Sequence, residues 1–127
     1  MKWLERFSDP AYAVLRILSG FLMSFHGLQK VFGFLATNRP PLFSQIGMGG
    51  LIELVGGLAI LLGFQTRLAA FFCSGTMAVA YIQFHWKFQV GPGFFPAINE
   101  GELALVYCFL FLYLACRGAG QWAVDKA

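Results

Sequence analysis

A single carboxylate stands inside the most apolar stretch of this chain. Residues 51–64 read LIELVGGLAILLGF, so Glu53 lies among aliphatic residues and glycines. A charged side chain at the centre of a bilayer costs about 2.5–3.5 kcal/mol on insertion scales, so an acid in such a segment usually has a partner or a task. We therefore expect other polar groups of the chain to gather around Glu53.

The composition is that of an integral membrane protein. Hydrophobic residues make up 58% of the chain and charged residues only 12%, whereas about 25% of the residues in a soluble domain are charged. At 127 residues the chain is expected to form one domain, residues 1–127. Its net charge of +3 is scattered and forms no basic stripe, so the expected partner is the lipid bilayer and not nucleic acid.

Four apolar segments of helical length follow one another, at about residues 11–35, 47–63, 68–88 and 99–116. About 20 apolar residues are enough to cross the hydrocarbon core of a bilayer. The breaks between the segments contain proline, glycine and polar residues, which favour turns and loops. The predicted fold is therefore all-α, a four-helix transmembrane bundle that crosses the membrane several times.

Lysine and arginine predict how this bundle sits in the membrane. Six of these residues fall on one side (Lys2, Arg6, Arg16, Arg67, Arg117 and Lys126) and three on the other (Lys30, Arg39 and Lys87). Because cytoplasmic segments are enriched in both residue types, both termini are predicted to be cytoplasmic. Arg16 lies about one turn into the first helix and is expected to snorkel to the cytoplasmic face.

Local signals predict where two of the helices begin. Asp9 followed by Pro10 has the pattern of an N-cap with proline at the first helical position. Asn99, with Glu102 three residues later, has the pattern of a capping box.

Two helix faces are singled out by their spacing. In the second helix, Glu53 shares a stripe with the small residues Gly49, Gly56 and Gly63, which would let another helix approach closely and would turn the carboxylate toward the bundle. In the third helix, one face carries Ser74, Ala78, Tyr81 and His85.

The predicted orientation brings polar groups from all four helices to one level, in the outer half of the membrane. These groups are His26 and Lys30 from the first helix, Glu53 from the second, His85 from the third, and Asn99 and Glu102 from the fourth. His26 and Lys30 are four residues apart and so share a helix face. This convergence is the strongest functional signal in the sequence.

Each group has a functional and a structural interpretation. His26 and Lys30 could hold a quinone headgroup or handle protons, since histidine titrates near neutral pH and lysine donates hydrogen bonds; otherwise they tie helices together. Glu53 could accept protons or bind a metal, or form an ion pair with Lys30 or Arg39. His85 could assist at the site or lie idle at the membrane interface.

A metal site remains an alternative for the same cluster. His26, Glu53, His85 and Glu102 supply two imidazoles and two carboxylates, which suit zinc, iron or manganese. No fixed spacing supports this interpretation, because the four ligands come from four separate helices. The sequence therefore predicts no metal ligands and leaves the cofactor open between a quinone and, less favoured, a metal ion.

Several motifs together resemble the DoxX family of small four-helix membrane proteins. They are Leu15-Arg16 with Gly20, HGLQK at residues 26–30, ELVGGL from Glu53, Gly63 with Thr66-Arg67, Ala80-Tyr81 with His85, NEGE at residues 99–102, and GAGQWAVD at residues 118–125. The set covers nearly the whole chain in order. Alanine follows Trp122 where the family often has serine, and this departure falls in a turn outside the polar cluster.

The resemblance implies a protein of the bacterial inner membrane. Some members of the family act as the membrane subunit of a thiosulfate:quinone oxidoreductase, and others are linked to oxidoreductase assemblies with superoxide dismutase and a sulfurtransferase. The family has no single reaction, so the resemblance leaves open whether this chain is itself an enzyme.

The sequence supports a leading hypothesis and alternatives of other classes. In the first, the chain is a redox-associated subunit of an oxidoreductase complex, active in oxidative-stress or sulfur-compound metabolism. His26 and Lys30 would hold a quinone or small substrate, Glu53 would exchange protons, and His85 would assist, with Asn99 and Glu102 completing the binding site. The second hypothesis is a non-catalytic membrane anchor for soluble partners, which would dock on the surface of Arg16, Arg67 and residues 118–125. The third is a small transporter or metal-binding bundle; four helices make a thin transport pathway unless the chain forms a homo-oligomer.

Overall fold

The computed structural model describes residues 1–126, which contain helices and no strands. The long helices are α1 (Ser8–Phe32), α2 (Gln45–Leu62), α3 (Thr66–Ala80) and α5 (Glu102–Arg117). The short ones are the 3₁₀ helices η1 (Lys2–Phe7) and η3 (Pro92–Phe94), the π-helix η2 (Tyr81–Trp86), which continues α3, and α4 (Pro96–Asn99). Three stretches are long and apolar enough to cross a membrane: Lys2–Phe32, Gln45–Leu62 and Thr66–Trp86.

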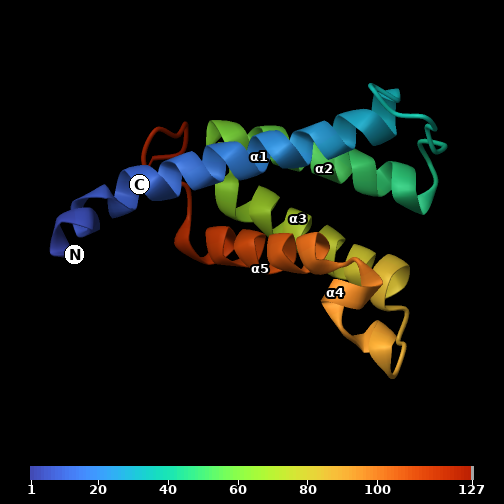
Figure 1. Cartoon of the computed structure of the whole chain (residues 1–127). Coiled ribbons are helices and arrows are strands. Elements are labelled where there is room, and N and C mark those ends of the chain that lie inside the picture. Colours follow the sequence, from blue (N-terminus) through green and yellow to red (C-terminus); the bar gives the residue numbers. More distant parts are fainter. Residues whose placement is uncertain (127) are drawn as a thin grey trace.

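The long helices form two pairs, α1 with α2 and α3 with α5, and the contact between α2 and α3 joins the pairs (Figure 1). The pairs lie close together at the end that carries the termini and spread apart toward the end with the longer loops. The core is built from buried apolar side chains of all four helices: Tyr12, Met23, Ile60, Ala70, Cys73, Met77, Tyr107, Phe111 and Leu114.

Glycines set the distance between α1 and α2. A Cβ atom added to Gly20, Gly27 or Gly57 would collide with the backbone of the facing helix. Small residues allow such close approach in membranes, where packing and not the hydrophobic effect drives helix association. The stripe predicted around Glu53 faces α3 instead: a Cβ on Gly56 would lie 2.6 Å from the Cys73 sulfur. Helix α2 therefore uses one glycine face for each neighbour.

Two predicted helix starts are wrong. Helix α1 begins at Ser8, because η1 runs directly into it, and the Asp9 carboxylate accepts a hydrogen bond from Arg117 at 3.0 Å. No side chain caps α5, which begins at Glu102. The capping box does not form because Glu100, at φ 63°, turns the chain into the left-handed region between α4 and α5. The Asn99 side chain instead accepts a hydrogen bond from the Gly101 N–H at 2.9 Å.

Arg16 does not snorkel to the surface, as the sequence predicted, but is fully buried at 0% exposure. Its guanidinium donates to the carbonyl oxygens of Ile60 at 3.1 Å, Gln121 at 2.8 Å and Trp122 at 2.7 Å, and also to that of Ala119. The carboxyl-terminal tail folds back onto α1 and supplies acceptors that water would otherwise provide. Such satisfaction is what allows a charge to remain buried.

The same tail also closes the turn between α2 and α3. The N–H groups of Val124 and Asp125 donate to the carbonyl oxygens of Leu62 and Gly63 at 3.0 and 2.7 Å. The Asp125 carboxylate accepts from the Thr66 N–H at 2.9 Å, at the start of α3. This hydrogen bond lowers the pKa of Asp125 below its usual 3.8, and a carboxylate is favoured at a helix N-terminus. The tail is thus an integral part of the fold.

Candidate functional site

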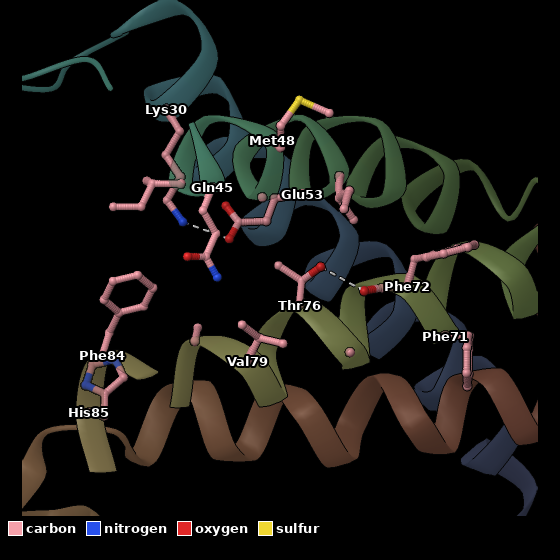
Figure 2. Close-up of a pocket in the computed structure, with 15 residues that line it drawn as sticks. Lys30, Gln45, Met48, Glu53, Phe71, Phe72, Thr76, Val79, Phe84 and His85 are labelled. Atoms are coloured by element: carbon pink, nitrogen blue, oxygen red, sulfur yellow. Dashed lines mark hydrogen bonds and ion pairs between the residues drawn. The ribbon is translucent and has the colours of Figure 1, made fainter. Parts of the chain in front are cut away.

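An elongated cavity of about 690 Å³ lies between α2 and the continuous helix α3–η2 (Figure 2). This volume is within the range of sites that bind small molecules. Most of its walls are apolar, and its polar side chains are Lys30, Gln45, Glu53, Thr76 and His85. Three of the six predicted site residues therefore line one cavity.

Lys30 and Glu53 form an ion pair in the cavity wall. The Lys30 ammonium lies 2.8 Å from Glu53 Oε1, and the Glu53 side chain is 2% exposed. Lys30 extends from α1 across α2 at Gly50, where any Cβ would collide with the lysine side chain. Of the partners expected for Glu53, Lys30 is the one that reaches it. A buried pair of this kind is by itself weak evidence for a stabilising role.

The second carboxylate oxygen of Glu53 distinguishes this site from a closed ion pair. Glu53 Oε2 is buried and has no hydrogen-bond partner among the described residues. A buried polar atom without a partner costs about 1–3 kcal/mol, more when it is charged, and native structures contain few of them. Figure 2 shows the carboxylate in the space between α2 and α3. The site therefore offers an unused acceptor beside a positive charge.

The π-helix η2 places His85 and Gln83 near the loop end of the cavity. His85 Nδ1 lies 3.3 Å from the Asn99 carbonyl oxygen, so its N–H can donate there and leave Nε2 as an acceptor in the neutral ring. Gln45 Nε2 donates to Gln83 Oε1 at 2.6 Å and links the start of α2 to η2. Segments of π-helix occur frequently at functional sites.

The remaining predicted residues lie outside the cavity lining. His26 is half-buried on α1, and Glu102 is exposed at the start of α5. Asn99 contacts His85 through its backbone, and its side chain donates to the Tyr81 hydroxyl at 3.2 Å. Helix α5, which carries Glu102, lies against α3.

The alternative metal quartet is not assembled in this structure. Within residues 1–126, no group of three His, Cys, Asp or Glu side chains is close enough to hold a metal ion.

The sequence did not indicate the cavity face of α3. The predicted face contains Ser74, whose hydroxyl donates to the Cys108 carbonyl oxygen at 2.7 Å, so that face packs against α5. The cavity is lined instead by the neighbouring face, which carries Phe72, Thr76 and Val79. The only sign of this face in the sequence was Thr76, a hydroxyl residue within a largely apolar segment.

Comparison with known proteins gives a consistent family match. The DoxX family model matches residues 11–86. An uncharacterized protein of Haemophilus influenzae is 39% identical over 99% of this chain and 96% of its own length. Inner membrane protein YqjF of Escherichia coli is 30% identical over 97% of this chain and 95% of its own. CatD of Bacillus subtilis, whose name assigns it provisionally to the oxidoreductases, is 26% identical over 88% and 82%. No solved structure matches.

Proposed function

This chain belongs to the DoxX family of membrane proteins, and from that premise we propose that it binds a quinone or a similar ring-headed lipophilic molecule between α2 and α3. One observation carries the proposal: an unpartnered carboxylate oxygen of Glu53 lies beside the Lys30 ammonium in a largely apolar cavity. Apolar walls with a few convergent polar groups are the usual features of a small-molecule site.

The polar groups match both oxidation states of such a ligand. A quinone carbonyl accepts a hydrogen bond from Lys30, and a quinol hydroxyl donates one to Glu53 Oε2. Reduction of a quinone consumes two electrons and two protons. In this proposal Glu53 exchanges protons with the ring, His85 assists from the loop end of the cavity, and the electrons come from a partner redox protein. His26, Asn99 and Glu102 remain predictions, since none of them lines the cavity.

Fewer observations support the redox role than support ligand binding. Among the relatives compared, CatD alone carries an oxidoreductase name. The bacterial inner membrane is the proposed location, in keeping with the name of YqjF. A non-catalytic anchor for soluble partners is the alternative, but Arg16 cannot be part of its docking surface, because the tail buries it completely.

The ligand prediction is tested by organic extraction of detergent-purified protein followed by mass spectrometry. Wild type is expected to retain a quinone or related lipid in stoichiometric amount. Glu53→Gln removes the charged acceptor and is expected to lower the retained amount by about tenfold, because hydrogen bonds to charged groups contribute about 1.5–3 kcal/mol.

Glu102→Gln is the matched control, since it removes an exposed carboxylate outside the cavity. It should retain the ligand as wild type does. Equal retention by all three proteins would overturn the role of Glu53. Ligand-free wild type that also fails to take up added quinone would overturn the binding proposal and favour the anchor.

A further inference from the structure

We propose that the ligand of this site carries a long apolar tail, which lies along α3 from Thr76 to Phe71 and enters sideways from the lipid. This inference rests on the proposed function. It adds the position of an apolar tail on that ligand and the route by which the molecule arrives.

The cavity is longer than a ring requires and is polar along only part of its length. From Ala80 to Phe71 its wall on α3 extends over about 14 Å, at 1.5 Å per residue. In Figure 2, His85 and Phe84 lie at one end, Glu53 and Thr76 in the middle, and Phe71 and Phe72 at the other end. The Thr76 hydroxyl is already used, since it donates to the Phe72 carbonyl oxygen at 2.9 Å. The section toward Phe71 therefore offers a ligand only apolar contacts.

The apolar section opens toward the surroundings of the helices. Phe71 and Phe72 line the cavity and are nevertheless 61% and 54% exposed. Both belong to a helix that is long and apolar enough to cross a membrane. In a membrane, exposed side chains at this depth face hydrocarbon and not water, so a ligand in this section is in contact with the lipid.

Gly75 gives independent support for an occupant. It lies in the cavity wall, and a Cβ added there would meet no atom within 4 Å. Glycine weakens a helix relative to alanine, and at Gly20, Gly27 and Gly57 the close approach of another helix explains it. No part of the described chain explains Gly75. Open space in front of it, in the cavity that Glu53 also lines, fits a ligand that passes over this position.

Photoaffinity labelling tests the position of the tail. The probe is a decyl-benzoquinone with a diazirine at the end of the tail, added to the full chain in nanodiscs of bacterial phospholipid. We expect saturable labelling within residues 71–75, located by mass spectrometry. A tailless benzoquinone should need at least about tenfold higher concentration to compete, because it loses the contacts along α3.

Gly75→Phe serves as a plug, Gly75→Ala is the smaller substitution at the same position, and Val14→Phe, at an exposed position of α1 outside the cavity lining, is the control that should label as wild type does. The plug is expected to lower labelling by about tenfold, since its ring fills the path of the tail. Gly75→Ala should fall between wild type and the plug, because its methyl group fills only part of the space that the tail would occupy. If the plug variant does not fold, the residues labelled in the wild-type protein still show where the tail lies.

The outcomes separate this inference from the proposed function. Saturable labelling that depends on Glu53 but maps to α5, and ignores Gly75→Phe, would overturn the tail site and leave headgroup binding intact. Absence of any saturable labelling would overturn both. If Gly75→Phe changes the oligomeric mass measured by light scattering while labelling is absent from residues 71–75, the groove is a contact between copies of the chain and the inference fails.

Discussion

Arg16 is the residue that connects the two ends of the chain. It lies in the first half of α1 and donates to carbonyl oxygens of α2 and of the tail. Arginine suits this task because its planar guanidinium presents five donors in a fixed geometry, which lysine cannot reproduce. A buried arginine that binds backbone carbonyls in this way stabilises the fold by organising the tail.

Replacing Arg16 by lysine is expected to lower the free energy of unfolding by about 2 kcal/mol, because buried carbonyl oxygens lose their donors. Unfolding of the purified protein in mixed micelles, followed by circular dichroism, measures the change. Arg6→Lys is the control, since Arg6 is exposed in η1 and its replacement should shift stability by less than about 0.5 kcal/mol. Equal shifts in the two variants would contradict a structural role for Arg16.

At the scale of helices, the pairing of α1 with α2 depends on backbone contact. A Cβ added to Gly57 would collide with the Ser24 backbone, whereas a Cβ added to Gly49 would lie 3.8 Å from the methyl carbon of Thr76. Replacing glycine by alanine is therefore expected to destabilise the protein on the α1 face of α2 but not on the α3 face. This pairing also matters for the site, because it brings Lys30 across α2 to Glu53.

Gly57→Ala is expected to destabilise the protein by about 1–3 kcal/mol, the usual range for overpacking. Gly49→Ala makes an ordinary contact and should be neutral or slightly stabilising, because alanine is the better helix former. The same mixed-micelle unfolding experiment compares the two variants. Comparable stability of both would mean that α1 and α2 can separate without loss.

At the scale of the whole molecule, the tail decides which end of the protein carries the C-terminus. Helix α5 has 16 residues, about 24 Å at 1.5 Å per residue, whereas the hydrocarbon core is about 30 Å thick. Length alone therefore does not decide whether α5 crosses the membrane. The hydrogen bonds of Asp125 at the α2–α3 turn nevertheless place the tail beside the first half of α1. Helix α5 must then return the chain to the end where it started.

Both termini then lie on one side of the membrane. Because lysine and arginine are in excess at that end of the molecule, we expect this side to be the cytoplasm. Green fluorescent protein fused after the tail should fluoresce, since it folds in the cytoplasm. Alkaline phosphatase inserted in the loop at Arg39 should be active, since it requires the oxidising side of the membrane. A dark fluorescent-protein fusion together with an inactive phosphatase would invert the orientation. A dark fusion together with an active phosphatase would show that α5 does not cross.

Sequence periodicity served best where each helix is regular. The stripe around Glu53 predicted correctly that the carboxylate faces inward, because α2 keeps 3.6 residues per turn throughout. Regular spacing wrongly grouped His85 with Ser74 on one face of the third helix. The π-helix η2 places more residues in each turn than an α-helix does, so the spacing rule does not hold up to His85. His85 consequently shares the cavity wall with Ala80, and the face predicted from regular spacing packs on α5.

The sequence by itself determined the class of fold, the family and the need of Glu53 for a partner, because composition and the energy of a charge in lipid are local properties. It could not choose between Lys30 and Arg39, exclude His26 and Glu102 from the cavity lining, or foresee the burial of Arg16. Those outcomes depend on which helices pair and on the path of the tail. They are long-range contacts, and only the tertiary structure decided them.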